Sequence, residues 1–311
     1  MKHGLFINQK KAICSIYESG LMIKDVIKGY SNEYTIDYAE LDASLTGIST
    51  FHYDFFIVNW HNHTLNISNS LLNKLIGPKI AIVVEVNPND YIPYTPDWFD
   101  AYAVIDPTKE RSGKFFPFPR PLVEAETKPL LDENKFILGS FGLYSEQFSN
   151  EKRFDEIIDA ANSSNRDCVV RINLPLPTYT NTSITQIANY GKWLEKKANS
   201  NVDVVISHDY MDRNKLIAWL SEHNMNCFPY YRERPGLAAV TDQAVSSGRA
   251  IMTTNCSTFR HLHKYIDSYP NQSYLSLAES TLYGVGRMRN DWSANKFRLT
   301  FDNMLRELRI I

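Results

Sequence analysis

The sequence predicts an α/β fold of two domains, and three observations lead to it. Short apolar runs alternate along the chain with segments that have the apolar spacing of helices. Short continuous apolar runs are typical of parallel strands that helices cover on both faces. The length of 311 residues suits two domains, and a proline-rich stretch near the middle separates two such alternations.

Both halves of the chain repeat a strand and then a helix. In the first half, apolar runs predict strands at residues 12–16, 34–38, 55–59, 80–86 and 101–105, with helices at 20–29 and 69–76. In the second half, strands are predicted at 136–141, 167–174, 202–207, 227–228 and 250–252, with helices at 151–161, 183–198, 212–222 and 237–245. Gly248 ends the last of these helices.

The boundary between the domains is predicted near residue 132. A helix cannot run through the stretch before it, which contains Pro117, Pro119, Pro121 and Pro129. We place an N-terminal domain at 1–132 and a C-terminal domain at 133–285. Residues 286–311 contain an amphipathic helix, predicted at 292–308.

Composition narrows the class of protein. Apolar residues make up 43% of the chain and the formal net charge is −2, so no broad basic field favours non-specific binding to nucleic acid. The cysteines Cys14, Cys168, Cys227 and Cys256 are far apart and fit reduced thiols. No signal peptide and no run of 18 apolar residues is present, which predicts a cytoplasmic protein without a transmembrane segment.

Residues 226–255 are the most informative stretch, because they read as strand, polar loop, helix and strand. The loop carries Arg232, Glu233, Arg234, Pro235 and Gly236, and Leu237 begins the helix. In open α/β sheets, ligands bind beyond the carboxyl ends of the strands. The free N–H groups of a helix that begins there favour an anion. Arg232, Gly236 and Leu237 are therefore candidate residues for binding an anionic ligand.

This stretch resembles the donor-binding region of retaining glycosyltransferases of the GT-B fold, particularly family 4. The matching pieces are Pro229-Tyr230-Tyr231, Glu233, Gly236 and Asp242-Gln-Ala244-Val-Ser-Ser-Gly248-Arg-Ala-Ile251. The resemblance implies two Rossmann-like domains that face each other across a cleft. It also implies a nucleotide-diphospho-sugar donor, bound mainly by the second domain, and a terminal helix that crosses back onto the first domain. A plain surface helix is the alternative.

Two carboxylates are assigned by the resemblance. Glu233 takes the place of the acidic residue that holds donor-sugar hydroxyls, and Asp242 the place of the one that holds the ribose. Carboxylates suit both roles because sugar hydroxyls are hydrogen-bond donors. Eight residues separate Glu233 from Asp242, where the family has seven and a second glutamate. The alternative for Glu233 is a loop carboxylate paired with Arg232 or Arg234.

A second candidate region opens the C-terminal domain. Gly139 lies in the predicted strand at 136–141, and Gly142 directly follows it. Both glycines would let the backbone approach a phosphate closely. Lys152 or Arg153, at a helix start, takes the place of the family's basic residue for the donor diphosphate. The alternative is a solvated helix end.

Three histidines lie where predicted strands end. His61 and His63 are candidates for acceptor activation or phosphate contact, and no further His, Cys or Asp cluster is evident to complete a metal site with them. A structural histidine is the alternative. His208 lies in a loop that touches the nucleotide base in related proteins. Where the family commonly has a histidine, after the strand at 80–86, this chain has Glu85 and Asn87.

The sequence thus predicts a metal-independent glycosyltransferase without a cofactor, which uses a nucleotide-sugar donor and, by the family, a saccharide or glycoconjugate acceptor. A modified nucleic-acid base is a rival acceptor. A non-catalytic nucleotide-sugar-binding protein is a rival function. An enzyme that uses a dinucleotide is disfavoured, because the first β/α unit lacks the Gly-x-Gly-x-x-Gly pattern.

Overall fold

A computed structural model describes residues 1–10, 14–29, 31–41, 52–61, 63–65, 67–87, 97–144, 151–164, 166–176, 182–233, 236–268 and 274–311. The chain divides into two compact units. The first unit comprises Met1–Val123, Arg234–Leu237 and Asp291–Ile311, and the second comprises Glu124–Glu233 and Ala238–Asn290. Each unit is built on a parallel sheet with alternating helices, which confirms the predicted α/β class.

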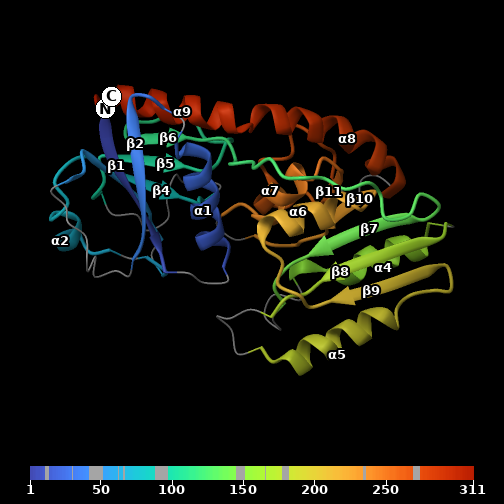
Figure 1. Ribbon diagram of the computed structural model, residues 1–311. Helices are drawn as coiled ribbons and strands as arrows, with labels where there is room; N and C mark the ends of the chain where they lie inside the picture. The colour runs from blue at the N-terminus through green and yellow to red at the C-terminus, as the bar shows by residue number, and fades with distance from the viewer. Residues whose placement is uncertain are drawn as a thin grey trace. The chain divides into compact units, whose positions relative to one another are not determined.

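The first unit contains a sheet of six described strands in the order β2-β1-β3-β4-β5-β6 (Figure 1). The strands are β1 (Lys2–Gln9), β2 (Tyr34–Leu41), β3 (Phe55–Asn59), β4 (Lys79–Val83), β5 (Ala101–Val104) and β6 (Phe115–Pro117). The helices are α1 (Ser15–Ile27), α2 (Asn69–Leu72) and α9 (Ala294–Glu307). A separate apolar cluster covers each face of this sheet, so the strands are buried on both sides.

The predicted strand at 12–16 is wrong. The first strand is β1, and α1 already begins at Ser15, while residues 12 and 13 lie outside the described residues. The thiol of Cys14 caps this helix by accepting the backbone N–H of Tyr17. The apolar run 12–16 resembles a strand, but Cys14 within it is the N-cap of a helix. The signal for β1 was the short run at Leu5 to Ile7.

The C-terminal helix α9 belongs to the first unit and completes one of its apolar clusters. Phe297, Phe301, Met304 and Leu305 lie buried among side chains of the sheet and of α1. The Tyr34 hydroxyl donates to Asp302 Oδ1 over 2.8 Å, and Arg306 pairs with Glu33. The segment that ends the chain is thus an integral part of the first unit's core.

The second unit contains a sheet of five described strands in the order β11-β10-β7-β8-β9. The strands are β7 (Phe136–Phe141), β8 (Cys168–Asn173), β9 (Val202–Ser207), β10 (Met225–Phe228) and β11 (Ala250–Thr253). The helices are α4 (Phe154–Asn162), α5 (Ile184–Glu195), α6 (Arg213–Ser221), α7 (Val240–Ser246) and α8 (Tyr274–Asp291), with the 3₁₀ turn η2 (Ser257–Phe259). Helix α8 lies in a part of the chain for which no helix was predicted.

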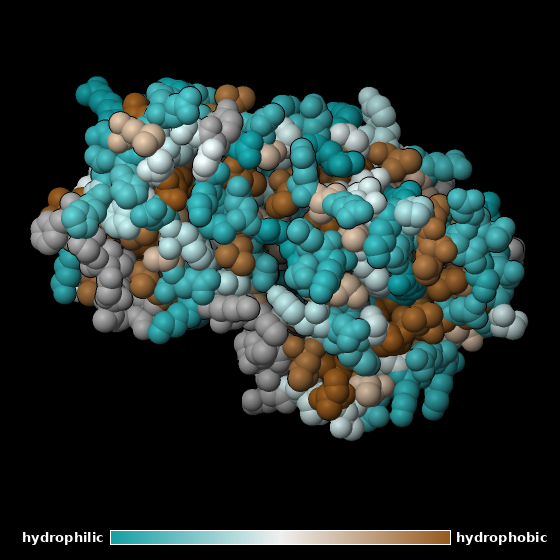
Figure 2. Space-filling model, viewed as in Figure 1, coloured by the Kyte–Doolittle hydropathy of each residue, from teal (hydrophilic) through white to brown (hydrophobic). Residues whose placement is uncertain are grey.

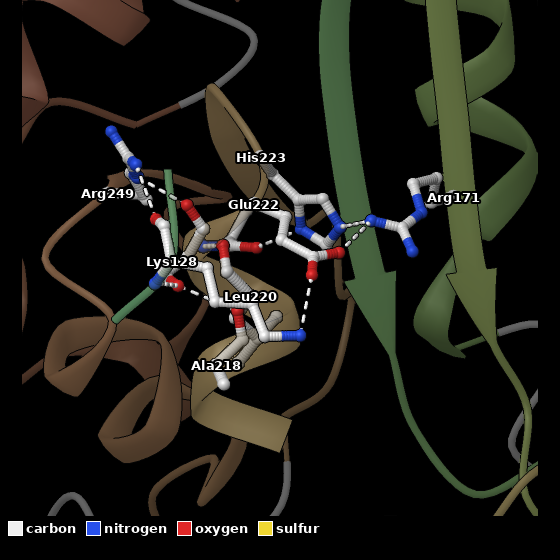
Figure 3. A network of polar contacts seen from close by, with 9 residues as sticks. Lys128, Arg171, Ala218, Leu220, Glu222, His223 and Arg249 are labelled. Carbon is white, nitrogen blue, oxygen red and sulfur yellow. Dashed lines mark hydrogen bonds and ion pairs between the residues drawn. The ribbon is translucent and has the colours of Figure 1, made fainter. Parts of the chain in front are cut away.

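A polar network secures the chain where it enters the second unit (Figure 3). Glu222, at the end of α6, accepts from Lys128 over 3.0 Å and from Arg171 over 2.8 Å. Arg249 donates to the backbone carbonyls of Ser221 and Lys128. These bonds join the segment after Pro121 to β8, α6 and β11.

The ring of His223 occupies the space beside Gly139. A Cβ atom placed on Gly139 would lie 1.8 Å from His223 Nδ1, so only glycine fits there. Gly139 therefore packs against His223 inside β7, and the expectation that its backbone approaches a phosphate is wrong.

The viewed surface is mostly hydrophilic, with brown areas over the part of the second unit that holds β8, β9 and α5 (Figure 2). Val205 on β9 and Ile184 on α5 expose about half of their side chains. None of the described helices has the length and hydropathy needed to cross a membrane.

Candidate functional site

The carboxyl ends of β7 and β10 lie beside each other in the second sheet and bring the predicted donor-binding residues together. Gly142 follows β7, and the loop 229–233 follows β10. The buried Tyr230 connects the two, because its hydroxyl donates to Phe141 O over 3.4 Å. Its own carbonyl accepts from the Thr254 hydroxyl, which follows β11. The loop is thus held against three neighbouring strand ends.

We call the carboxyl ends of these strands, with the loops that follow them, the rim of the second sheet. Lys152 lies beneath this rim, and its ammonium group is largely shielded from water. The Nζ atom donates to the carbonyl of Leu143, and a Cβ atom on Gly142 would lie only 3.1 Å from it. Burial, together with the nearby positive charge of Arg232, lowers the pKa of Lys152 to about 7. Glycine at 142 therefore lets the backbone and this amine come close to each other.

Arg232 lies beside Lys152, and its Nε atom is buried without a hydrogen-bond partner. Among the described residues, no ion pair joins a carboxylate to Arg232 or to Lys152, and the neighbouring Glu151 only partly opposes the effect of burial and of Arg232 on the pKa of Lys152. The suggested pairing of Glu233 with Arg232 is not observed there, and Arg234 lies outside the described residues. Two neighbouring cations without an ion-paired carboxylate are suited to bind an anion.

Arg153 differs from Lys152 in its surroundings. Its Nη2 atom lies 2.7 Å from Glu156 Oε1, in the first turn of α4, and its guanidinium lies over the ring of Tyr231. The backbone of Arg153 is left-handed, with φ of 49°. The charge of Arg153 is therefore already compensated by its own helix, which separates the two basic candidates.

The two predicted carboxylates lie in different environments. Glu233 is exposed at the end of the loop after β10. Asp242 lies in α7 and is 1% exposed, so almost none of its surface is open to a ligand. The structure thus brings Glu233, but not Asp242, to the solvent-facing side of this rim.

His208 follows β9, on the other side of β8 from β7. A carbonyl only accepts, so His208 Nδ1 donates to Leu174 O over 3.1 Å, which leaves Nε2 as the acceptor in the neutral ring. Asn173 and Ser207 bond to each other at the neighbouring strand ends over 3.0 Å. This group of polar side chains continues the rim beyond β7.

In the first unit, His61 lies at the end of β3 and is 9% exposed. Its Nδ1 atom accepts the backbone N–H of His63, so Nε2 carries the proton and donates to Glu85 over 3.1 Å. Both ring nitrogens are therefore engaged. His63 is exposed, and its ring centroid lies 5.7 Å from that of His61.

Gly236 and Leu237 belong to the first unit rather than the second. The N–H of Gly236 donates to Val86 O over 2.9 Å, and a Cβ atom at Gly236 would lie 3.4 Å from Glu85 Cγ. The φ of 91° at Gly236 is one that glycine adopts without strain. Leu237 is buried. The described residues contain no group of three or more His, Cys, Asp or Glu side chains that could hold a metal ion.

Two functional features were not fully recognised in the sequence. Tyr230 was seen only as part of a motif, although it holds the loop against β7. The pair of His61 with Glu85 joins residues that follow β3 and β4, which are adjacent in the sheet. Adjacent strand ends in a correctly ordered sheet would have been the signal for that pair.

No protein-family model and no curated protein sequence matches the chain. Solved structures do match. HepE from Anabaena, in complex with UDP-glucose, has a TM-score of 0.64 over 100% of both chains at 9% identity. The trehalose-6-phosphate synthase OtsA has a TM-score of 0.59 over 100% of this chain and 99% of its own, at 9% identity. TarM from S. aureus has a TM-score of 0.50 over 80% of this chain and 55% of its own, at 11% identity. The likeness shows that the chain has the GT-B fold.

Proposed function

From the GT-B fold, we propose that this protein is a glycosyltransferase that moves a sugar from a nucleotide-diphospho-sugar to an acceptor. Its second unit binds the donor. Support comes from the neighbours crystallised with UDP or UDP-glucose and from the cations at the rim of the second sheet.

The adjacent side chains of Lys152 and Arg232, neither in an ion pair with a described residue, are the observation that carries this proposal. They lie at the carboxyl ends of β7 and β10, where α/β sheets bind ligands. Holding two positive charges close together without an ion-paired carboxylate costs free energy, and a bound diphosphate would reduce that cost. Arg153 is the weaker candidate for the diphosphate, because Glu156 already compensates it.

In the proposed reaction, the same two cations stabilise the leaving diphosphate in the transition state. As the bond from the sugar to the diphosphate breaks, negative charge grows on the leaving oxygen. Cations already fixed beside that oxygen stabilise the transition state without reorganising. Glu233 would accept hydrogen bonds from sugar hydroxyls, and His208 Nε2 would accept one from the nucleotide base. Transfer with retention, to a saccharide or glycoconjugate and without a metal ion, is the finer form of this proposal.

The test is binding and turnover of a panel of nucleotide-diphospho-sugars, beginning with UDP-glucose. Thermal stabilisation measures binding, and release of nucleoside diphosphate measures turnover. Lys152→Ala and Arg232→Ala should each weaken binding about 10- to 100-fold, as expected for lost charge-assisted bonds. Lys192→Ala and Arg166→Ala, which alter exposed side chains of the same unit, are the matched controls.

The outcomes separate the rival functions. Binding without release, even with acceptors present, favours a nucleotide-sugar-binding protein. Glu233→Ala should reduce turnover more than nucleotide binding, with Glu195→Ala as the control for an exposed carboxylate. Equal binding by Lys152→Ala and the wild type would contradict the proposed diphosphate site.

A further inference from the structure

The start of α4 departs from the usual pattern of a helix start. The residue before a helix usually has an extended backbone and a side chain that accepts a hydrogen bond from the first turn. Ser183 before α5 and Asp212 before α6 follow this pattern. Arg153 before α4 has a left-handed backbone, with φ of 49° and ψ of 44°, and its side chain makes no capping hydrogen bond. Arg153 therefore does not serve to start the helix.

Two costs accompany this arrangement. A left-handed backbone is strained for a residue that has a side chain. A positive charge at the N-terminus of a helix also opposes the helix dipole, although Glu156 and Asp155 in the first turn lie 2.7 Å and 3.9 Å from the guanidinium. Strained residues persist where their surroundings fix them, and they gather at functional sites. The contacts of Arg153 therefore indicate its role.

One of these contacts is made with the loop that carries Arg232. The guanidinium carbon of Arg153 lies 5.2 Å from the ring centroid of Tyr231. The carbonyl of Glu151 accepts the backbone N–H of Tyr231 over 2.7 Å. The residues before and after Lys152 in the sequence thus both contact the residue before Arg232.

These two contacts hold two like charges together. The positive charge of Arg232 lies close enough to Lys152 to lower its pKa. Like charges repel, so contacts outside the pair must keep them adjacent. The hydrogen bond from Tyr231 to Glu151 uses only backbone atoms. The side chains that specify the arrangement are therefore the guanidinium of Arg153 and the ring of Tyr231, which attract each other as a cation and an aromatic face.

Direct contact between Arg153 and the diphosphate is the alternative. The guanidinium of Arg153 already lies against Glu156, so a phosphate would have to compete with that carboxylate. Lys152 and Arg232 present no such competition among the described residues. The geometry favours a division of labour, in which one arginine organises the site and the other binds the anion.

We propose that Arg153 is a positioning residue, which holds Arg232 beside Lys152 through the ring of Tyr231 and does not itself bind the diphosphate. The inference rests on the proposed function for the identity of the anion. It adds Arg153 and Tyr231 as the residues that organise the site.

The first measurement needs no ligand. NMR titration of isotope-labelled lysine side chains in the full chain follows the pKa of Lys152, and the signal missing from Lys152→Arg identifies it. Burial and the charge of Arg232 lower this pKa to about 7, so it should rise when Arg232 moves away. Tyr231→Ala changes no charge and should raise the pKa, whereas Tyr231→Phe keeps the ring and should leave it unchanged.

Two further variants separate a moved Arg232 from other causes. In an Arg232→Ala background, Tyr231→Ala should raise the pKa of Lys152 no further, because the charge is already absent. A further rise there would report water entering the site. Arg153→Gly should act like Tyr231→Ala, and glycine adopts the left-handed backbone without strain, so this variant removes the side chain without weakening the turn.

Binding of UDP-glucose, measured by calorimetry, separates positioning from direct contact. If Arg153 acts through Tyr231, Arg153→Gly and Tyr231→Ala should each weaken binding about 5- to 10-fold, the effect of one cation–ring contact. The double variant should weaken it no further than either single change. A direct contact would make the two effects multiply, or would leave Tyr231→Ala without effect. Tyr283→Ala, which removes an exposed ring from α8, is the matched control.

Circular dichroism and thermal melting verify that each variant folds. The inference is overturned if folded Tyr231→Ala leaves the pKa of Lys152 unchanged, if that variant raises it equally without Arg232, or if the effects of Arg153→Gly and Tyr231→Ala on UDP-glucose binding multiply. A wild type that binds no nucleotide-diphospho-sugar would contradict the proposed function. A raised pKa of Lys152 in Tyr231→Ala would still establish the positioning in that case.

Discussion

At the residue scale, burial of Lys152 disfavours the positive charge that binding of a diphosphate would require. Burial and the charge of Arg232 lower the pKa of Lys152 to about 7, far from the ordinary value of about 10.4. The protein therefore holds a partly neutral amine where a diphosphate would need a cation. A bound diphosphate must raise that pKa again.

We expect nucleotide-diphospho-sugar binding to take up a proton above neutral pH. Free Lys152 loses its proton above pH of about 7, and the bound diphosphate restores it. Affinity should then fall with rising pH, by up to tenfold per unit, until the pKa of the complex is reached. Titration calorimetry at pH 8 in two buffers of different ionisation heat measures the uptake. Lys152→Arg should bind without it; equal proton uptake by that variant would refute the assignment.

A stability measurement tests the same residue without a ligand. The folded pKa of about 7 lies below the ordinary value, so between these values the unfolded chain binds more protons than the folded one. The resulting destabilisation is fully present below pH of about 7 and disappears as pH rises toward 10. Lys152→Met should raise the free energy of unfolding by about 2 to 4 kcal/mol at pH 7. Urea melts at pH 7 and pH 10 should show the gain shrinking, whereas a gain independent of pH would point to better packing alone.

At the element scale, the corner between α6 and β10 depends on a neutral histidine. Asn226 Nδ2 donates to Leu220 O and Ser247 Oγ, so its Oδ1 atom accepts from His223 Nδ1 over 2.9 Å. Arg171 donates to His223 Nε2 over 3.3 Å (Figure 3). Both ring nitrogens are thereby assigned, and a second proton has no acceptor.

We expect this corner to make the second unit sensitive to acid. Burial, opposed by the bond to Asn226 and assisted by the charge of Arg171, lowers the pKa of His223 to about 4. Between the ordinary value of about 6.5 and this pKa, the unfolded chain binds more protons, so stability falls as pH falls. The loss approaches about 3 kcal/mol at pH 4. Urea melts from pH 7 to 4 on wild type and His223→Gln measure it, and an equally steep loss in the variant would place the acid sensitivity elsewhere.

The sequence predicted most elements because their apolar patterns are strong. Residues 136–141 and 202–207 were predicted with the bounds of β7 and β9. The errors have local causes. Cys14 is an unusual helix cap, so the apolar run at the start of α1 resembles a strand. Small and polar residues such as Gly284 and Gly286 dilute the apolar pattern of helix α8.

The candidate site was less predictable, because it depends on contacts between strands distant in sequence. The family resemblance indicates Lys152 or Arg153, and the place of the loop after a strand indicates Arg232. Only the structure shows that Glu156 compensates Arg153 and that Lys152 lies beside Arg232. Gly139 looked like part of a phosphate loop, and its actual neighbour is His223. Local patterns carry the type of a residue but not its partner.

At the scale of the whole molecule, the first unit is built from stretches that are separate in the sequence. Residues 124–233 and 238–290 form the second unit, yet the chain then returns to complete the first with 291–311. The apolar clusters of the first unit and the cluster of the second share no residues. Each unit therefore has its own core, and only the first unit requires the end of the chain.

We expect truncation after Asn290 to unfold the first unit and to spare the second. The truncation removes five side chains that are at most 1% exposed: Trp292, Phe297, Phe301, Met304 and Leu305. Each large apolar side chain lost from a core costs about 2 to 5 kcal/mol of stability. The summed loss therefore exceeds the lower part of the range of about 5 to 15 kcal/mol that is ordinary for a domain. Hydrogen exchange should show β1 to β5 losing protection while β7, β8 and β10 keep it. Phe301→Ala in the full chain is the milder comparison, with a partial loss confined to the first unit. Loss of protection in both sheets would show instead that the second unit cannot fold without the first, and full protection in both would show that α9 is dispensable to the core it covers.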